Sequence, residues 1–133
     1  RGPVLAVFFK VSCPPCQYTL PFIERLHKLA GNSSVQIFGI SQDSREETEE
    51  FCKEYGISFP VLLDENGYAA SNDYGLHFVP TLFLIGNDGE IQLMSEGFCK
   101  ADLLELQGKL KLPHGAGKEL FKAGENVPEF RPG

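Results

Sequence analysis

The chain has 133 residues, a net charge of −6 and a hydrophobic content of 42%. This length accommodates one domain, and the apolar fraction is that of a globular protein rather than a disordered one. The acidic balance and the lack of a basic run exclude a nucleic-acid surface, so no nucleic-acid partner is expected. No apolar stretch approaches the ~20 residues that a membrane span requires.

Local patterns predict an α/β fold with the order βαβα, then a β-hairpin, then a final helix. The first half requires a right-handed parallel crossover, and the hairpin adds antiparallel strands. We therefore expect a mixed central sheet with helices on both faces. The expected strands cover residues 4–9, 35–40, 59–63, 82–85 and 90–95, the expected helices cover 14–30, 44–56, 68–74 and 101–112, and turns are expected at 64–67 and 86–89.

A change in composition divides the chain near residue 113. Residues 1–112 hold the predicted domain, whereas residues 113–133 form a tail punctuated by Gly and Pro, for which we expect mostly irregular structure. The chain starts at Arg1, directly before a predicted strand, which suggests a domain excised from a longer protein.

Two cysteines mark the junction between the first predicted strand and the first predicted helix. Cys13 and Cys16 flank two prolines that suit the first turn of a helix. The free N–H groups and aligned peptide dipoles at a helix N-terminus favour the thiolate form of a cysteine, and a thiolate is the nucleophile of disulfide exchange. The spacing therefore predicts a redox pair in which Cys13 attacks and Cys16 resolves.

Several separate motifs, in this order, resemble those of thioredoxin-fold proteins of the redoxin branch. The branch includes the TlpA/ResA-type thiol–disulfide oxidoreductases and the peroxiredoxin-like AhpC/TSA proteins. The resemblance covers about residues 4–112 and is specific because the motifs occur together. The motifs are Cys13-Pro-Pro-Cys16 followed by Pro21 inside the helix, Gly-Ile-Ser-Gln-Asp at 39–43, Tyr-Gly-Ile-Ser-Phe-Pro at 55–60, Val-Pro-Thr at 79–81 and the Asn-Asp-Gly hairpin at 87–89.

The resemblance implies a thioredoxin-like fold in which the Val79–Pro80 peptide bond is cis and packs against the two cysteines. Cis peptide bonds are almost confined to proline. In such proteins the backbone of the residue before this proline pairs with the substrate, which implies a substrate contact for Val79. Pro80, Ser12 and Pro14 are expected to line the same substrate site.

Three positions depart from the patterns of these relatives. Ser12 stands where thioredoxins have a tryptophan, Val7 where they bury an acid, and Thr19 where ResA-type proteins have a glutamate. The proton acceptor for the resolving thiol is therefore unassigned, with water and Lys10 as candidates. Lys10 would also favour the thiolate by its charge, and His77 is a second candidate auxiliary group near the predicted cis bond.

The cysteines allow other interpretations. A four-cysteine zinc site would need Cys52 and Cys99 to converge on the first pair, but structural zinc sites draw their ligands from closely spaced pairs. We therefore predict no metal and no cofactor. A purely structural disulfide within the first pair would close too small a ring to stabilise much. Cys52 is expected to be a buried apolar group, and for Cys99 core packing is favoured over a redox role.

These observations predict an enzyme, a thiol–disulfide oxidoreductase that acts on protein disulfides or dithiols and has a redox partner. Two alternatives stay open: a thiol peroxidase that reduces peroxides through Cys13, and a non-catalytic binding module that reuses the fold. Lys10 occupies the position of the peroxiredoxin threonine, which counts against efficient peroxide reduction. We expect a monomer. Because redoxins of this branch are often exported, a periplasmic or membrane-tethered full-length protein is favoured over a cytoplasmic one.

Overall fold

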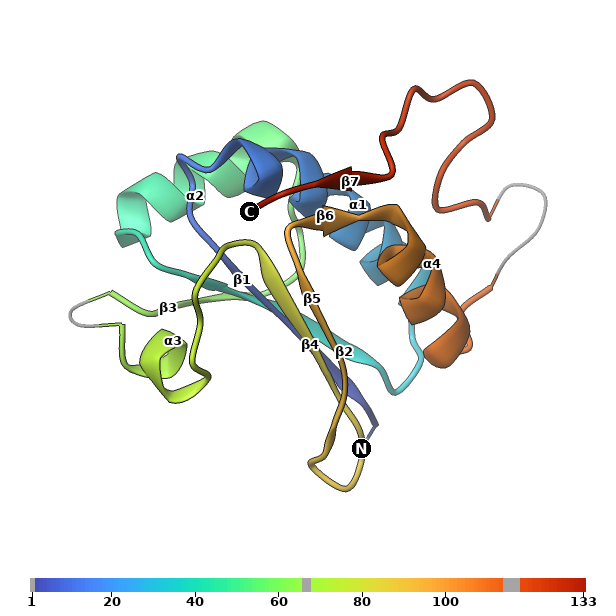
Figure 1. Ribbon diagram of the computed structural model, residues 1–133, viewed down its shortest axis with the longest axis horizontal. Helices are drawn as coiled ribbons and strands as arrows, with labels where there is room; N and C mark the ends of the chain where they lie inside the picture. The colour runs from blue at the N-terminus through green and yellow to red at the C-terminus, as the bar shows by residue number, and fades with distance from the viewer. Residues whose placement is uncertain (1, 66–67, 114–117) are drawn as a thin grey trace.

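A five-stranded mixed sheet forms the centre of the computed structural model, which describes residues 2–65, 68–113 and 118–133 (Figure 1). Its strand order is β3-β2-β1-β4-β5, in which β1, β2 and β3 run parallel, β4 is antiparallel to β1, and β5 is antiparallel to β4. A separate antiparallel sheet pairs β6 with β7. The strands are β1 (Val4–Phe9), β2 (Gln36–Ser41), β3 (Val61–Leu63), β4 (Thr81–Ile85), β5 (Ile91–Glu96), β6 (Phe98–Cys99) and β7 (Phe130–Arg131).

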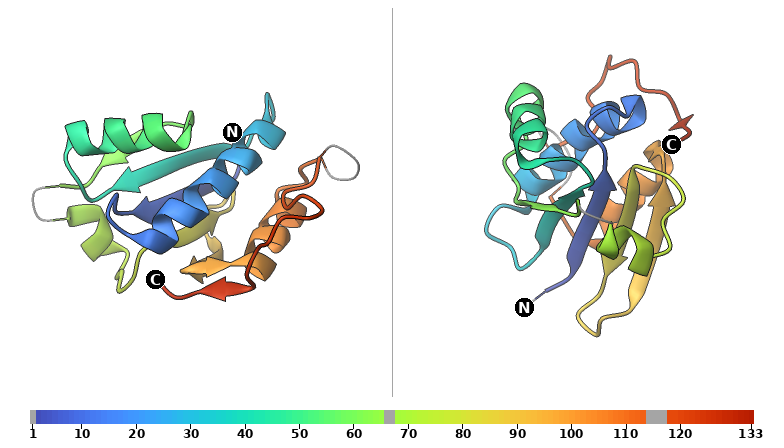
Figure 2. Two further views of the ribbon diagram at one scale, coloured as in Figure 1. Left: turned by 90° about the horizontal axis from the view of Figure 1, so that it is seen from above. Right: turned by 90° about the vertical axis from the view of Figure 1, so that its left-hand side faces the viewer.

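Among the described residues, four helices pack on the two faces of the central sheet, as the predicted α/β class requires. They are α1 (Pro14–Ala30), α2 (Arg45–Tyr55), α3 (Ala69–Asp73) and α4 (Lys100–Lys109). Helices α1, α2 and α4 cover one face and α3 lies against the other (Figure 2). Alternate side chains of β1 divide between the two sides: Leu5, Val7 and Phe9 enter the larger core, whereas Ala6 and Phe8 enter the smaller one. Burial on both faces explains why this strand is apolar throughout.

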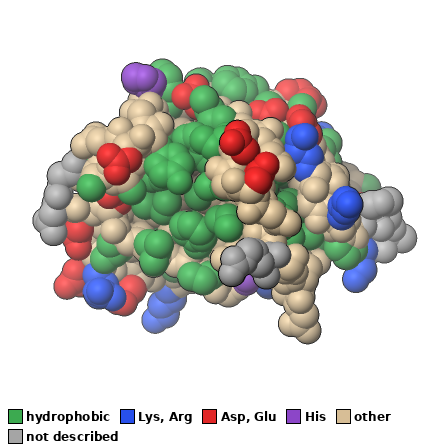
Figure 3. Space-filling view, turned by 90° about the horizontal axis from the view of Figure 1, so that it is seen from below, with side chains coloured by type: hydrophobic (Ala, Val, Ile, Leu, Met, Phe, Trp, Pro, Cys, Tyr) green, Lys and Arg blue, Asp and Glu red, His purple; other side chains and the backbone are tan. Residues whose placement is uncertain are grey.

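The face that carries α3 is only partly covered. Leu62, Met94 and Phe78 are 57%, 53% and 51% exposed. Leu62 pairs with Ile40 and Met94 pairs with Phe83, which both belong to the smaller core. Apolar side chains therefore gather in the open on this side of the molecule, as Figure 3 shows.

One helix ends earlier than its sequence pattern predicts. Helix α4 stops at Lys109 rather than at Leu112, because Lys111 adopts a left-handed backbone with φ of 55°. This turn brings both Leu110 and Leu112 into the core, where they are 7% and 4% exposed. Burial of two leucines in place of one outweighs continuation of the helix.

The N-terminus of α2 is capped as predicted. The hydroxyl oxygen of Ser44 accepts the backbone N–H of Glu47 at 3.2 Å. Part of the expected turn at 64–67, residues 114–117 of the tail and Arg1 lie outside the described residues.

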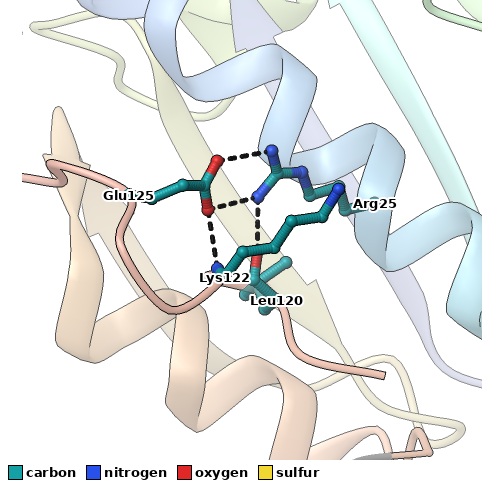
Figure 4. A network of polar contacts seen from close by, with 4 residues as sticks. All are labelled: Arg25, Leu120, Lys122 and Glu125. Carbon is teal, nitrogen blue, oxygen red and sulfur yellow. Dashed lines mark hydrogen bonds and ion pairs between the residues drawn. The ribbon is translucent and has the colours of Figure 1, made fainter. Parts of the chain in front are cut away.

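A polar cluster anchors the C-terminal segment to α1 (Figure 4). The Arg25 guanidinium donates to both carboxylate oxygens of Glu125, at 2.9 and 2.7 Å, and to the carbonyl oxygen of Leu120 at 2.8 Å. The backbone N–H of Lys122 donates to the same carboxylate at 2.6 Å. These bonds, above all those from Arg25, lower the pKa of Glu125 to about 2. The cluster therefore fixes residues 120–125 against the body of the domain.

Replacing Glu125 by glutamine should destabilise the fold by about 1 kcal/mol at pH 7, the upper end for a partly exposed ion pair. A carboxyl group whose pKa falls from 4.5 to about 2 on folding stabilises the folded chain above pH 4.5. That contribution is lost as the pH falls through 2. The urea midpoints of wild type and Glu125→Gln should therefore converge between pH 4.5 and pH 2. Glu119→Gln, at an exposed position in the same segment, is the control; a pH-independent difference would contradict the assignment.

Candidate active site

The loop between β1 and α1 places Cys13 at the N-cap of α1. Its backbone is extended, and its sulfur accepts the N–H of Cys16 at 3.2 Å. The backbone N–H of Cys13 donates to the carbonyl of Lys10 at 3.3 Å, and the side-chain amide of Gln17 donates to the carbonyl of Val11 at 2.9 Å. The sulfur thus receives one of the unpaired N–H groups at a helix N-terminus, where negative charge is stabilised.

A segment far away in the sequence meets Cys13 from the side of β4. The Val79–Pro80 peptide bond is cis, as the resemblance implies. The Cys13 thiol donates to the carbonyl oxygen of Val79 at 3.4 Å. Val79 is half-buried and Pro80 is buried, and the hydroxyl of Thr81 donates to the carbonyl of Phe78 at 2.6 Å, which ties the segment to itself. The structure thus gathers the first cysteine and the segment around the cis bond at one site.

The two cysteines differ sharply in access to solvent. Cys16 lies in the first turn of α1 and is 0% exposed, whereas Cys13 is half-buried. Burial raises the pKa of the Cys16 thiol, and its hydrogen bond to Cys13 and the charge of Asp43 act in the same direction. An incoming disulfide can therefore reach Cys13, while Cys16 is kept as a protonated thiol behind it.

Asp43 is a site residue that the sequence did not single out for chemistry. It follows the end of β2, and its carboxylate accepts the backbone N–H of Val11 at 2.7 Å. Because the carboxyl ends of the parallel strands β1 and β2 meet at one edge of the sheet, the carboxylate stands beside the cysteine loop. An acid two residues after the end of the second strand is the signal that could have identified it.

The other predicted site residues lie around the cysteines or further away. Ser12 and Pro14 flank Cys13 and are exposed, so both are accessible to a docked chain. Lys10 contributes its backbone carbonyl, and its side chain forms no ion pair within the described ranges. His77 is exposed, with its ring beside that of Phe78 at a centroid distance of 6.5 Å. Neither side chain has a hydrogen bond to a cysteine among the described residues.

Thr19 and the other two cysteines form no second site with the Cys13–Cys16 pair among the described residues. Thr19 is 0% exposed, and its hydroxyl has no hydrogen-bond partner in the part of the chain that the structure describes. All four cysteines are free thiols. Cys52 is only half-buried, and burial raises its pKa, while Cys99 is the N-cap of α4. Among residues 2–65, 68–113 and 118–133, no three His, Cys, Asp or Glu side chains gather to hold a metal ion.

The motifs and the geometry agree with one known protein family. A model of the AhpC/TSA family matches residues 1–94. The chain belongs to the AhpC/TSA family. This member of the family is 31% identical, over 99 residues, to the thiol-disulfide oxidoreductase ResA of Halalkalibacterium halodurans. The match covers 74% of this chain and 56% of that protein, and the chain spans about half the length of the curated relatives it matches.

Solved structures share the thioredoxin-like fold of this AhpC/TSA member. The structure assigned as a thiol:disulfide interchange protein DsbE from Chlorobium tepidum has a TM-score of 0.74 at 24% identity, covering 82% of this chain and 77% of that one. A thiol-disulfide isomerase from Corynebacterium glutamicum has a TM-score of 0.72 at 25% identity, covering 81% and 79%. No helix in the described parts of the chain is long and apolar enough to cross a membrane.

Proposed function

We propose that this AhpC/TSA-family protein is a thiol–disulfide oxidoreductase that exchanges disulfides with protein substrates through Cys13 and Cys16. The proposal rests on one observation, a half-buried thiol at a helix N-terminus with a fully buried thiol one turn further on. The Val79 carbonyl, 3.4 Å from the first sulfur, adds a backbone acceptor beside the reacting atom. Similarity to ResA of H. halodurans supports the same chemistry.

In the reductive direction, the Cys13 thiolate attacks one sulfur of a substrate disulfide. The substrate S–S bond breaks, a mixed disulfide forms, and the departing substrate thiolate takes up a proton. Cys16 then loses its proton, attacks the sulfur of Cys13 and releases the second substrate thiolate. Two electrons pass to the substrate, and the protein is left with a Cys13–Cys16 disulfide. The oxidative direction uses the same steps in reverse.

The resolving step needs a group that takes the proton of Cys16, because a buried thiol with a raised pKa does not ionise by itself near pH 7. We assign this role to Asp43. Its carboxylate stands at the edge of the cysteine loop, held by the N–H of Val11, and its charge acts on the Cys16 thiol. Lys10 acts on that thiol only through its backbone, which lowers the Cys16 pKa, and neither the Lys10 nor the His77 side chain has a comparable connection to it within the described residues.

Replacing Asp43 by asparagine should slow the release of substrate from the mixed disulfide about a hundredfold, the usual contribution of a general base. Asparagine keeps an oxygen for the Val11 N–H, so the loop is retained. The loss of negative charge should at the same time lower the pKa of Cys16, because that charge raises it. Stopped-flow kinetics and an ultraviolet thiolate titration measure the two effects. A lower pKa together with faster release would show that the carboxylate acts only through its charge.

A redox titration tests the proposed function directly. The protein should show one reversible two-electron couple, and the Cys13→Ser/Cys16→Ser double variant should lose it. The Cys52→Ser/Cys99→Ser double variant is the matched control and should keep the couple. A titration without any reversible couple would refute the proposal and favour a binding module. Peroxide consumption above that of a free-thiol control would instead point to a thiol peroxidase, the activity suggested by part of the family name.

We further infer that the protein acts as a monomer on disulfides or dithiols of other proteins and is returned to its starting state by a redox partner. A position outside the cytoplasm, periplasmic or tethered in the full-length protein, is favoured because disulfides persist in such compartments. Fractionation of cells that express the full-length protein tests the location, and recovery in the cytosolic fraction would contradict it.

A further inference from the structure

The chain's own C-terminal residues lie beside the candidate active site. β7 pairs with β6 in antiparallel register, and the backbone N–H of Lys100 donates to the carbonyl of Glu129 at 2.9 Å. In Figures 1 and 2 this segment runs towards the first turn of α1, where the cysteines are. All residues from 129 to 133 are exposed. Main-chain pairing and surface contacts, rather than burial, therefore hold the segment in place.

The end of this segment reaches the residue expected to bind substrate. A Cβ atom built on Gly133 would lie 2.6 Å from the carbonyl oxygen of Val79 and 3.3 Å from the Cβ of Phe78. On its other side, a Cβ built on Gly97 would collide with the carbonyl of Arg131 and lie 2.9 Å from the nitrogen of Gly133. Residues 131–133 thus run between Gly97, which directly precedes β6, and the carbonyl of Val79, to which the Cys13 thiol donates.

A side chain of the same segment rests on the helix that carries both cysteines. The guanidinium carbon of Arg131 lies 5.1 Å from the ring centroid of Tyr18 on α1, within the range of a cation–π contact. The segment therefore touches β6, the segment around the cis bond and α1 together. An extended peptide that brought a disulfide to Cys13 would meet these same three elements.

We propose that residues 129–133 occupy the place of an extended peptide substrate, so that the chain carries an internal competitor for its own active site. This inference rests on the proposed function, because it names what a protein substrate must displace. The occupant adds a strand to the edge of β6, as peptides do in recognition by strand addition. A substrate would bind along the same edge, with a basic side chain over Tyr18, and an acidic protein of net charge −6 suits such a chain.

Residues 120–125 (the root of the C-terminal segment) and residues 129–133 (its tip) are held differently, which suits a displaceable occupant. The Arg25–Glu125 cluster and the buried Leu120 fix the root. The exposed tip is kept near its site by this tether, so its local concentration is high although its contacts are few. The apparent affinity for substrate is then the intrinsic affinity multiplied by the fraction of molecules whose site is open.

Three variants release the tip and leave the root intact. The first ends the chain after Pro128, which removes only exposed residues. The second is Gly133→Ala in the full chain, because the added Cβ collides with Val79. The third is Arg131→Ala, which removes the contact with Tyr18. Gly108→Ala, an exposed glycine with no neighbour within 4 Å of the added Cβ, is the control.

Two measurements on the four proteins and wild type separate this proposal from the proposed function. One is the kcat/KM for insulin reduction, compared with that for a small aromatic disulfide. The other is the rate at which a bulky maleimide alkylates Cys13, compared with iodoacetamide and located by mass spectrometry. If one site in ten is open in wild type, releasing the tip should raise the rates of insulin reduction and of bulky-maleimide alkylation about tenfold. The rates with the small disulfide and with iodoacetamide should stay unchanged.

Each outcome decides one of the two proposals. Faster alkylation without any disulfide reduction would support the internal competitor and refute the proposed function. Equal rates of insulin reduction and of bulky alkylation in all folded proteins would refute the internal competitor and leave the proposed function standing. Slower insulin reduction in the released variants would also refute it, because the segment would then be part of the substrate site. If the shortened chain fails to fold, Gly133→Ala and Arg131→Ala decide the question.

Discussion

Replacing Cys13 by serine should abolish the reduction of insulin, with a loss of about a thousandfold or more, as expected when an essential nucleophile is removed. A serine hydroxyl stays protonated near pH 7 and does not attack a disulfide sulfur, whereas a thiolate does. Cys13 is the thiol that receives the N–H of Cys16 at the helix N-terminus and faces Val79. Cys52→Ser is the matched control, since Cys52 lies on α2 and its replacement should leave the rate unchanged.

Replacing Cys16 by serine should have a different result, a trapped mixed disulfide. Attack by Cys13 does not need the second thiol, but resolution does, so the covalent complex with substrate accumulates. Non-reducing electrophoresis after mixing with a disulfide-bonded protein should show this complex, and peptide mapping should place the bond at Cys13. A complex joined through Cys52, or one that forms equally in Cys13→Ser, would overturn the assignment of roles.

Local sequence signals predicted the parts of the site that depend on neighbouring residues. The apolar run of β1, the cysteine pair and the prolines that start α1 are adjacent, and strand, turn and helix N-terminus follow from short-range rules. The N-cap Ser44 and its partner Glu47 are three residues apart, so their contact could also be predicted from the sequence. The cis bond came from the resemblance, because its proline gives no local sign of the isomer.

Contacts between distant residues could not be predicted in the same way. The bond between Val11 and Asp43 spans 32 positions and exists only because β1 and β2 are neighbours in the sheet. Strands β6 and β7 have two residues each, too few for an alternating pattern to appear. The tail therefore looked irregular although its end lies against Val79. In both cases tertiary structure, rather than local propensity, decides where the residues go.

Replacing Phe98 by alanine should destabilise the fold by about 3–5 kcal/mol, the range for removal of a buried aromatic side chain. Phe98 is 0% exposed, and its ring lies 4.9 Å from that of Tyr18, 5.7 Å from Phe22 and 6.3 Å from Phe121 between centroids. These partners come from α1 and from the anchored C-terminal segment. The ring is thus the point where β6, the cysteine-bearing helix and the tail pack together.

Urea unfolding measures the effect of Phe98→Ala. Phe130→Ala is the control, because Phe130 is 56% exposed on the neighbouring strand, and its loss should change stability by less than about 0.5 kcal/mol. A loss below about 1 kcal/mol for Phe98→Ala would mean that the cavity collapses or that the aromatic cluster is not packed as described. A loss in the expected range would show that the packing of the Phe98 ring, rather than the pairing of β6 with β7, holds β6 in place.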